Sequence, residues 1–271
     1  MENVNNVAIL GGGHIGTAIA RGISASGKFS PEKIIITRRN VDLLENLKKE
    51  GFVIQQDNVD AVKKSEIIII SVQPQQFDGI VEEIGSYIDE SRHVLISVVS
   101  GVSIDQIRRH VGAGVSVIRA MPNTAVAIRQ SMTCLSAKNT SDRALQLAVN
   151  IFNSVGKTMV INEEQMIPAT ALCACGIAFF LRAIRAAAQG GIEIGFHAEE
   201  AIPMAAQTAM GAAALILDMQ NHPESEIDKV TTPKGCTISG LNEMEHRGFS
   251  SALIKGIVTS AEKAACLYNG D

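Results

Sequence analysis

A glycine-rich turn near the start of the chain constrains the fold more than any other stretch. The apolar residues 7–10 run directly into Gly11-Gly12-Gly13-His14-Ile15-Gly16, which has the spacing Gly-x-Gly-x-x-Gly. Residues 17–23 then carry apolar side chains at helical spacing, so the pattern predicts a strand, a tight turn and a helix packed on the strand. In such a turn the first glycine permits the bend, the second lets the backbone approach a pyrophosphate, and the third allows close helix packing.

The free amides at the start of the following helix would face the phosphates of a bound dinucleotide. We therefore predict a dinucleotide site whose contacts include Gly11, Gly13, His14, Ile15 and Gly16. The alternative is that the glycines form an ordinary turn. His14 is expected to face solvent rather than to act as a catalyst.

The end of the second predicted strand indicates which dinucleotide binds. Residues 34–37 form a β-branched run that is typical of a strand, and Arg38 and Arg39 follow it. In such folds an acidic residue about 20 positions beyond the glycines binds the ribose 2′-hydroxyl of NAD, whereas an Arg accommodates the 2′-phosphate of NADP. Thr37, Arg38 and Arg39 suit a phosphate, and no carboxylate comes before Asp42. We predict that NADP(H) is preferred over NAD(H); the alternative is that one or both arginines are solvated surface charges.

Strand-like and helix-like segments alternate through the first half of the chain. Residues 67–72 are apolar on both faces, which is typical of a parallel strand covered by helices on both sides. The alternation predicts a doubly wound sheet. The further predicted strands are 52–54, 93–98, 115–120, 131–135 and 157–161, and the predicted helices are 57–63, 104–110 and 141–154.

Three loops should line the cofactor cleft, because ligands of doubly wound sheets bind outside the carboxyl ends of the strands. They are residues 71–74, 99–101 and 121–124, although any one of them could be a plain connection. Asn58, in the helix predicted for residues 57–63, is a further candidate. From these segments we predict cofactor contacts at Asn58, Ser71, Val72, Gln73, Pro74 and Asn123.

The alternation stops near Asn162, after which only helix-like segments follow, at 165–189, 199–219 and 250–268. The first is apolar on nearly every side, so it must be covered all round. A few helices have limited means to bury so much apolar surface alone. We therefore predict an NADP-binding Rossmann-like domain over residues 1–162 and a helical dimerisation and substrate domain over residues 163–271.

Composition narrows the class of partner. The net charge of -4 and the aromatic content of 4% provide neither a basic field nor stacking platforms, so nucleic acid is not an expected partner and a small molecule is. No basic region followed by an apolar segment begins the chain, and the apolar run 169–181 is short and ends at Arg182. We expect a soluble cytoplasmic protein without a membrane segment.

The five cysteines are odd in number and lie in apolar or small-residue surroundings, which indicates reduced thiols rather than a disulfide framework. Cys173 and Cys175 could be imagined as half of a metal site. No second Cys or His pair lies at zinc-finger spacing from them, so buried thiols are predicted and no metal is.

A polar stretch in the helical half, residues 228–245, contains a second candidate site. Thr231, Thr232, Pro233 and Gly235 precede a predicted helix N-terminus, where hydroxyls and unpaired amides can hold an anion such as a carboxylate. The alternative is an N-cap formed by Thr237 or Thr232.

Taken together, these motifs resemble the pyrroline-5-carboxylate reductase family, which makes L-proline from Δ1-pyrroline-5-carboxylate with NAD(P)H in the last step of proline biosynthesis. The resemblance covers essentially the whole chain and is carried by residues 11–16, 71–74, 119–123 and 232–241. It implies a Rossmann domain followed by a helical domain interleaved with that of a partner subunit, and a homodimer that assembles further.

The resemblance also assigns roles within the 232–237 loop. It implies that Thr232 and the amides of Gly235 and Cys236 bind the substrate carboxylate, and that Thr237 lies next to the imine nitrogen as the catalytic residue. Lys234 and Cys236 depart from the family loop, which commonly reads Ser-Pro-Gly-Gly-Thr-Thr. Lys234 could add a cation for the carboxylate, and we expect it to point to solvent instead.

A second departure is at the start of the long central helix, where the family usually reads Ser-Gly-Ser-Gly-Pro-Ala. This chain has Cys173 and Cys175 in place of the hydroxyls, which leaves another cyclic imine as an alternative substrate. A further alternative is a β-hydroxyacid dehydrogenase, but its chemistry needs a lysine after this motif, whereas the next charges here are Arg182 and Arg185. A cofactor-sensing protein without turnover would have no use for the threonine loop.

Overall fold

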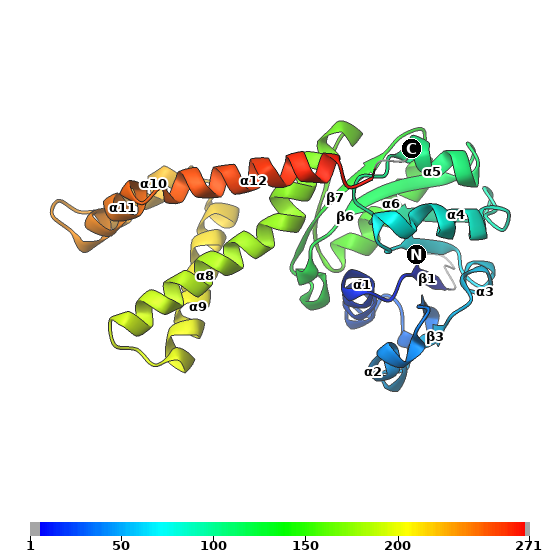
Figure 1. Cartoon of the computed structure of the whole chain (residues 1–271), viewed down its shortest axis with the longest axis horizontal. Coiled ribbons are helices and arrows are strands. Elements are labelled where there is room, and N and C mark those ends of the chain that lie inside the picture. The colour runs from blue at the N-terminus through cyan, green and yellow to red at the C-terminus, as the bar shows by residue number, and fades with distance from the viewer. Residues whose placement is uncertain (1–5, 269–271) are drawn as a thin grey trace. The chain divides into compact units, whose positions relative to one another are not determined.

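The computed structural model describes residues 6–268 of the chain (Figure 1). The chain divides into two compact units. The first contains the residues up to Cys175 together with those from Ser260 on, and the second contains Gly176–Thr259. The predicted domain boundary after residue 162 lies earlier than this division, and it remains a prediction.

The first unit is built on one sheet with the strand order β3-β2-β1-β4-β5-β6-β7-β8. All neighbouring strands are parallel except β6 and β7. The connection from β6 to β7 is too short for the crossover that a parallel pair needs, so the chain turns back on itself. The strands are β1 (Val7–Leu10), β2 (Ile34–Thr37), β3 (Val53–Gln55), β4 (Ile67–Ile70), β5 (Val94–Ser97), β6 (Ser116–Met121), β7 (Ser131–Ala137) and β8 (Gly156–Val160).

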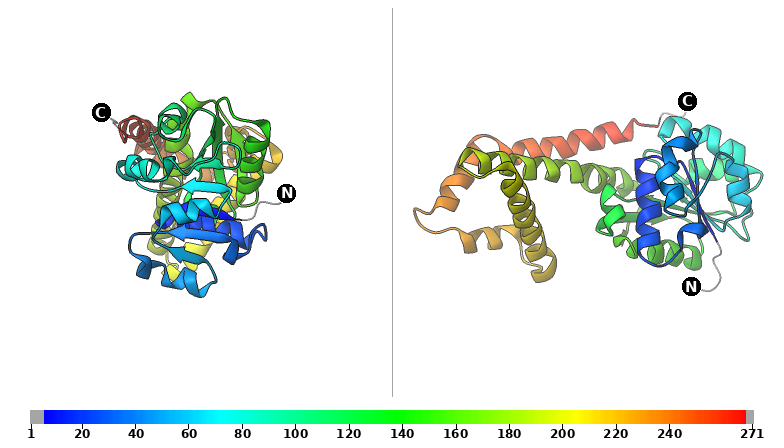
Figure 2. Two further views of the ribbon diagram at one scale, coloured as in Figure 1. Left: turned by 90° about the vertical axis from the view of Figure 1, so that its right-hand side faces the viewer. Right: turned by 90° about the horizontal axis from the view of Figure 1, so that it is seen from below.

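Helices cover both faces of this sheet, as the two views of Figure 2 show, which confirms the predicted doubly wound arrangement. They are α1 (His14–Ala25), α2 (Glu45–Lys49), α3 (Asn58–Lys63), α4 (Phe77–Gly85), α5 (Ile104–Val111) and α6 (Asp142–Asn153). Several begin at side-chain caps that the sequence supplies: Asp57 accepts from the amide of Asp60, and Ser103 forms a capping box with Gln106.

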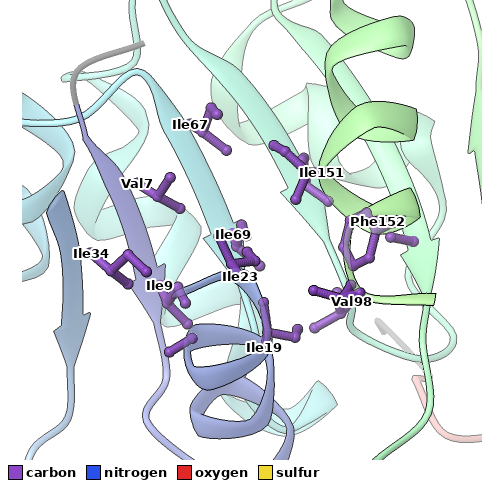
Figure 3. Close-up of a cluster of buried hydrophobic side chains, with 14 of the residues drawn as sticks. Val7, Ile9, Ile19, Ile23, Ile34, Ile67, Ile69, Val98, Ile151 and Phe152 are labelled. Carbon is purple, nitrogen blue, oxygen red and sulfur yellow. The ribbon is translucent and has the colours of Figure 1, made fainter. Parts of the chain in front are cut away.

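The two faces of each inner strand enter different cores, because successive side chains of a strand point to opposite sides. Val7 and Ile9 of β1 belong to the core under α1 and α6, which also contains Ile19 and Phe152 (Figure 3). Ala8 and Leu10 belong to the opposite core under α3, α4 and α5. Each fully buried Ile or Phe contributes about 1.5–3 kcal/mol relative to an exposed position, so these cores hold the sheet rigidly around the loops at its edge.

The segment that leads from the sheet into the helical half is not one regular helix. The helix predicted for residues 165–189 is divided into α7 (Met166–Ala169), a π-helical turn (Thr170–Cys175) and α8 (Gly176–Glu193). Thr170 Oγ1 donates to the carbonyl of Met166 at 2.8 Å, at the point where α7 passes into the π turn. π turns of this kind are rare and often occur at functional sites.

The second unit is entirely helical within Gly176–Thr259, as predicted. It contains α8, α9 (Ala198–Met219), α10 (Pro223–Val230), α11 (Cys236–His246) and the first part of α12 (Phe249–Ala265). Small residues let α8 and α9 approach: a Cβ on Gly191 would lie 3.2 Å from the Cβ of Ala201. Ala188 and Ala201 are accordingly buried.

Large apolar side chains of this unit remain exposed in the single chain. Phe180 of α8 is 61% exposed, and Met210 and Leu217 of α9 are 59% and 74% exposed. By length and composition alone, the segments Glu163–Glu193 and Ala198–Met219 could also cross a membrane. The expectation that α8 is covered all round is therefore not met within one chain, and a second surface must cover these side chains in water.

Candidate active site

The glycine turn between β1 and α1 has the geometry that its spacing predicted. Gly11 has φ +111°, and a Cβ there would lie 2.6 Å from the carbonyl oxygen of Ser71. A Cβ on Gly16 would collide with the carbonyl oxygen of Gly11, whereas a Cβ on Gly13 would meet nothing within 4 Å. Thus Gly11 and Gly16 are required for packing, while open space lies in front of Gly13.

Hydrogen bonds fix this turn against the ends of two neighbouring strands. The amides of Gly11 and Gly12 donate to the carbonyl of Thr37 at 3.2 and 2.8 Å, and Ser71 Oγ donates to the carbonyl of Gly11 at 2.7 Å. Since β1 lies between β2 and β4, the strand order reverses at this point, which is where doubly wound sheets bind dinucleotides.

The residues of the turn fit the pyrophosphate of a dinucleotide. Helix α1 begins at His14 with Gly13 as its N-cap, and no side chain within residues 6–268 caps it. The first amides of α1, at His14, Ile15 and Gly16, are therefore available to an anion, and the helix dipole favours one there. The His14 side chain is exposed, as expected.

The end of β2 brings two basic groups and a hydroxyl to the same edge. Arg38 Nη1 donates to the carbonyl of Gly12 at 2.6 Å, so this guanidinium lies against the glycine turn. Arg39 is exposed, and no ion pair of Arg39 occurs in the described part of the chain. Thr37 is 2% exposed, and its hydroxyl is already used: it donates to Asn58 Oδ1 at 2.6 Å.

The Asn58 side chain is held by Thr37 and by Glu83, and the sequence did not predict the contact with Glu83. Besides accepting from Thr37, its amide nitrogen donates to Glu83 Oε2 of α4 at 2.9 Å. The predicted elements omitted α4, so sequence reasoning missed Glu83. An amphipathic spacing through Phe77, Val81 and Ile84, all buried, is the signal that would have found this helix.

The three predicted loops do follow β4, β5 and β6, which run in the same direction and end at one edge of the sheet. Ser71 is buried, Val72 and Pro74 are half-buried, and Gln73 is exposed. Asn123 caps the turn after β6 by accepting from the amide of Ala125 at 3.1 Å, and its amide nitrogen donates to the carbonyl of Cys173 at 3.3 Å.

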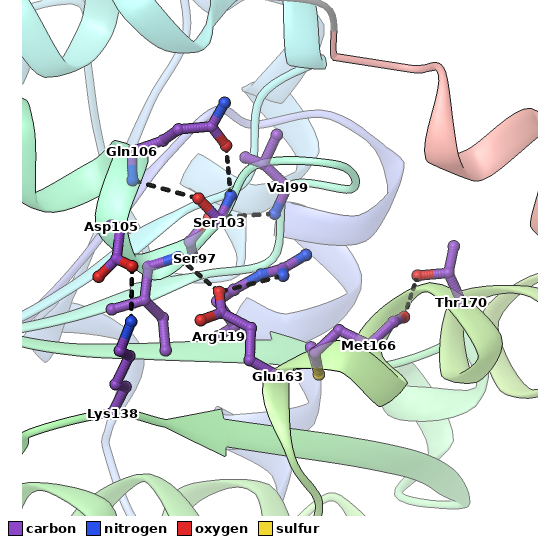
Figure 4. Close-up of polar contacts among 11 residues, drawn as sticks. Ser97, Val99, Ser103, Asp105, Gln106, Arg119, Lys138, Glu163, Met166 and Thr170 are labelled. Carbon is purple, nitrogen blue, oxygen red and sulfur yellow. Dashed lines mark hydrogen bonds and ion pairs between the residues drawn. The ribbon is translucent and has the colours of Figure 1, made fainter.

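A buried ion pair ties the beginning of the helical half to this edge (Figure 4). Arg119 of β6 is 4% exposed, and its Nη1 lies 3.4 Å from Glu163 Oε1. The same oxygen accepts from the amide of Ile104 at 2.6 Å, at the start of α5. Burial lowers the pKa of Arg119, and Glu163 opposes that shift. Glu163, a residue that sequence reasoning missed, thereby positions the start of α5, which follows the 99–101 loop.

The last residues described also pack on that loop. Tyr268 Oη donates to Asp78 Oδ1 at 2.6 Å, and this hydrogen bond raises the pKa of Tyr268 to about 12. A Cβ on Gly101, which has φ +86°, would lie 3.1 Å from the Cβ of Tyr268. Nothing in the sequence pattern connected Tyr268 with the cofactor edge.

In the second unit, the threonine loop forms a tight turn before α11. The amide of Gly235 donates to the carbonyl of Thr232 at 2.9 Å, and Lys234 between them is left-handed, with φ +61°. Gly235 is the N-cap of α11, and no side chain of residues 6–268 caps this helix. The alternative prediction, an N-cap formed by Thr237 or Thr232, is therefore wrong, because the helix begins at Cys236 and Thr237 already lies inside its first turn.

This loop has the features of an anion site. A Cβ on Gly235 would lie 2.5 Å from Thr232 Oγ1, so only glycine lets the turn close on that hydroxyl. The first amides of α11 are uncapped, and the side chains of Thr232, Cys236 and Thr237 are exposed. Lys234 is exposed as expected. The loop can therefore bind a carboxylate through backbone amides.

The cysteines do not form a metal centre in the described chain: no group of three or more His, Cys, Asp or Glu side chains is placed to hold an ion between residues 6 and 268. Cys134 is buried, Cys173 and Cys175 are half-buried, and Cys236 and Cys266 are exposed. All five are free thiols in the structure, but Cys173 and Cys175 are half-buried rather than buried as predicted.

Known proteins share both halves of this arrangement. Residues 163–267 match the family model described as pyrroline-5-carboxylate reductase dimerisation, and residues 6–101 match that of NADP oxidoreductase, coenzyme F420-dependent. Among solved structures, Plasmodium falciparum pyrroline carboxylate reductase with NADP bound has a TM-score of 0.90 at 24% identity, covering 99% of this chain and 100% of that one. The Coxiella burnetii pyrroline-5-carboxylate reductase has a TM-score of 0.86 at 28% identity, covering 98% and 100%.

Curated relatives are closer in sequence. Pyrroline-5-carboxylate reductase 1 of Dictyostelium discoideum is 55% identical over 97% of this chain, although the chain spans only 50% of that relative's length. Pyrroline-5-carboxylate reductase 2 of the same organism is 48% identical over 98% of this chain and 94% of its own length. The second relative matches this chain over nearly the full length of both, and solved structures of this name have the same fold. The chain therefore belongs to the pyrroline-5-carboxylate reductase family.

Proposed function

We propose that this protein reduces the C=N bond of Δ1-pyrroline-5-carboxylate with NADPH to give L-proline, the last step of proline biosynthesis. The observation that carries the proposal is the Thr232–Gly235 turn before the uncapped helix α11, in a chain that is 48% identical to a reductase of that name over 94% of its length. A lone carboxylate fits such a turn, and the substrate has one.

Residues of the first unit would bind the cofactor, and residues of the second unit would bind the substrate. Gly13 and the first amides of α1 would hold the pyrophosphate in the turn that Gly11 and Gly16 allow, and the loops after β4 and β6 would hold the nicotinamide half. The cofactor supplies a hydride when bound. In the second unit, Thr232 and the amides of Gly235 and Cys236 would hold the substrate carboxylate.

The reaction needs a hydride at carbon and a proton on nitrogen. A pyrroline nitrogen is basic enough to be substantially protonated in mild conditions, so no strong general acid is required and positioning supplies most of the rate. Thr237, in the first turn of α11, would donate or accept one hydrogen bond at the ring nitrogen, or orient a water there. Thr237→Ala should lower kcat without changing the melting temperature. An unchanged kcat would remove Thr237 from the mechanism.

The same site is proposed to prefer NADP(H) over NAD(H), because Arg38 and Arg39 bring positive charge to the end of β2 and no acidic residue follows that strand before Asp42. The test is the ratio of kcat/KM for NADPH and NADH. Replacing Arg39 with Ala should lower that ratio about tenfold, as expected for losing one charged contact to phosphate. A wild-type preference for NADH would contradict the proposal.

We propose that two chains associate through the exposed apolar side chains of α8 and α9, that dimers assemble further, and that the protein is cytoplasmic. The dimerisation family model covers both helices. A membrane could cover the same side chains by length and composition alone. Purification without detergent, followed by light scattering, distinguishes the two.

The decisive experiment is loss of NADPH absorbance with Δ1-pyrroline-5-carboxylate, run beside Δ1-piperideine carboxylate. Faster oxidation with the five-membered imine supports the proposal. Faster oxidation with the six-membered imine would mean that the thiols at Cys173 and Cys175 mark a different cyclic imine as substrate. Oxidation with neither, despite NADPH binding, would refute imine reduction.

A further inference from the structure

Two thiols that are remote in sequence pack in one small apolar cluster of the first unit. Cys134 of β7 is buried in a small apolar cluster with Met121, Met166 and Ala169, and Cys173 of the π turn packs against the same cluster. Met121 and Cys134 are register partners on β6 and β7, so the sheet itself sets the position of one thiol. Both thiols therefore lie against one small apolar cluster.

The two thiols differ in the way that a reactive pair requires. Cys134 is 4% exposed, whereas Cys173 is half-buried and reachable from solvent. The neighbouring Cys134 thiol lowers the pKa of Cys173 to about 7, and Cys173 together with burial raises the pKa of Cys134. Cys173 is therefore partly a thiolate at neutral pH, and thiolates are the form that peroxides oxidise. Burial instead raises the pKa of Cys175.

We propose that Cys134 and Cys173 are a redox pair that hydrogen peroxide converts into an intramolecular disulfide, with Cys173 as the attacking thiol and Cys134 as the resolving thiol. Sensor cysteines of this class combine an accessible thiolate with an adjacent second cysteine. The proposed reductase mechanism uses no thiol chemistry, so it gives neither Cys134 nor Cys173 a role.

The chemistry balances in two steps. The Cys173 thiolate attacks one peroxide oxygen, the O–O bond breaks, and the departing hydroxide takes a proton to leave as water, which gives a sulfenic acid at Cys173. The Cys134 sulfur then attacks the Cys173 sulfur, the S–S bond forms, the S–O bond breaks, and a second water leaves with the Cys134 proton. Two thiols lose two electrons in total, and the peroxide gains them. An external dithiol reverses the reaction by exchange.

Oxidation should reach the cofactor edge through Asn123. A disulfide draws the two sulfurs to about 2.0 Å, much closer than two thiols in contact. Because Cys134 is fixed in β7, the π turn that contains Cys173 must move toward it. The carbonyl of Cys173, which accepts from Asn123 Nδ2 at 3.3 Å, would move with it. This second step rests on the proposed cofactor role of Asn123, and it predicts weaker NADPH binding by the oxidised protein.

The first test is chemical and does not depend on activity. The purified full-length protein is treated with hydrogen peroxide at neutral pH, its remaining thiols are alkylated, and its peptides are analysed by mass spectrometry. We expect a linked pair of peptides containing Cys134 and Cys173, lighter by two hydrogen atoms, formed faster as the pH rises through about 7. Cys173→Ser and Cys134→Ala should abolish it, and Cys175→Ser, the matched change in the same turn, should not.

Linkage to Cys175 or Cys236, or a sulfinic acid at Cys173 without any disulfide, would overturn the proposal. Cys173→Ser introduces the hydroxyl that the family usually has at a half-buried position, so it keeps the test valid if Cys134→Ala fails to fold. Melting temperatures check the fold of each variant.

The second test is NADPH affinity, measured by fluorescence titration before and after oxidation. We expect the dissociation constant to rise severalfold in the oxidised wild type, to recover with a dithiol, and to stay unchanged in peroxide-treated Cys173→Ser. Equal affinities in the oxidised and reduced wild type would overturn the link through Asn123. If the protein reduced no imine, the proposed function would be refuted, but the disulfide mapping and the NADPH affinities would still test the redox pair.

Discussion

At the scale of single residues, Glu83 shows how a side chain remote from the glycine turn can act on cofactor binding. Its carboxylate accepts from Asn58 Nδ2, while Asn58 Oδ1 accepts from Thr37, so the amide of Asn58 is held in one orientation. Glu83→Ala should raise the KM for NADPH severalfold and leave kcat nearly unchanged, because only the orientation of a binding group is lost.

Steady-state kinetics with NADPH as the varied substrate measures this. Glu83→Gln is the matched control, because its amide oxygen can still accept from Asn58. If both variants keep the wild-type KM, Glu83 does not position Asn58.

His93 makes a separate prediction about stability and pH. It is buried beside β5, its Nδ1 accepts from the amide of Asp89, and burial, with Arg92 adding to it, lowers its pKa despite the opposing charge of Asp89. Because the folded protein holds His93 neutral, the unfolded chain takes up a proton first as the pH falls below about 6.5. Stability should therefore decline on acidification from that point.

Melting temperatures measured from neutral to mildly acidic pH test this. His93→Asn keeps an acceptor for Asp89 and cannot titrate, so its melting temperature should fall less steeply over the same range. Parallel curves for the wild type and His93→Asn would exclude His93 as the cause.

At the scale of elements, the turn before α11 depends on one glycine and tolerates change at its neighbour. Gly235→Ala would place a Cβ 2.5 Å from Thr232 Oγ1, so the turn must open and the first amides of α11 must move. We expect a loss of at least tenfold in kcat/KM for the imine, corresponding to about 1.4 kcal/mol. Lys234→Gly is the control: Lys234 is exposed at φ +61°, a conformation that glycine adopts freely, so kcat/KM should stay near the wild-type value.

The two variants together decide what Lys234 does. A marked rise in the KM for the imine in Lys234→Gly, greatest at low salt, would mean that Lys234 attracts the carboxylate rather than pointing to solvent.

At the scale of the whole molecule, the exposed apolar side chains of the helical unit predict self-association. Leu217 of α9 is 74% exposed, and a charge there should weaken a dimer formed by burying it. We expect Leu217→Glu to shift the mass seen by light scattering toward the monomer. Ile128→Glu, a matched change at a side chain of the first unit that is 71% exposed, should leave the mass unchanged. A monomeric wild type at micromolar concentration would contradict the prediction.

Most of the sheet was predictable because its information is local. Unbroken apolar runs such as residues 67–70 mark strands buried on both faces, and the glycine spacing marks one turn, so each needs only its own residues. The element ends were less predictable: β3 is Val53–Gln55 rather than 52–54, because its pairing with the distant strand β2 decides where it stops. Helices α2, α4 and α10 were missed because each is short, although the apolar spacing of α4 would have revealed that helix.

By itself, the sequence determined the fold class, the position of the dinucleotide turn and the composition of the anion loop, because glycine spacing, hydrophobic period and charge act between near neighbours. Only the tertiary structure decided that Glu83 holds Asn58 and that Cys134 and Cys173 pack in one apolar cluster. Each of these joins residues far apart in the chain, and such contacts exist only once burial of the two cores has brought their elements together.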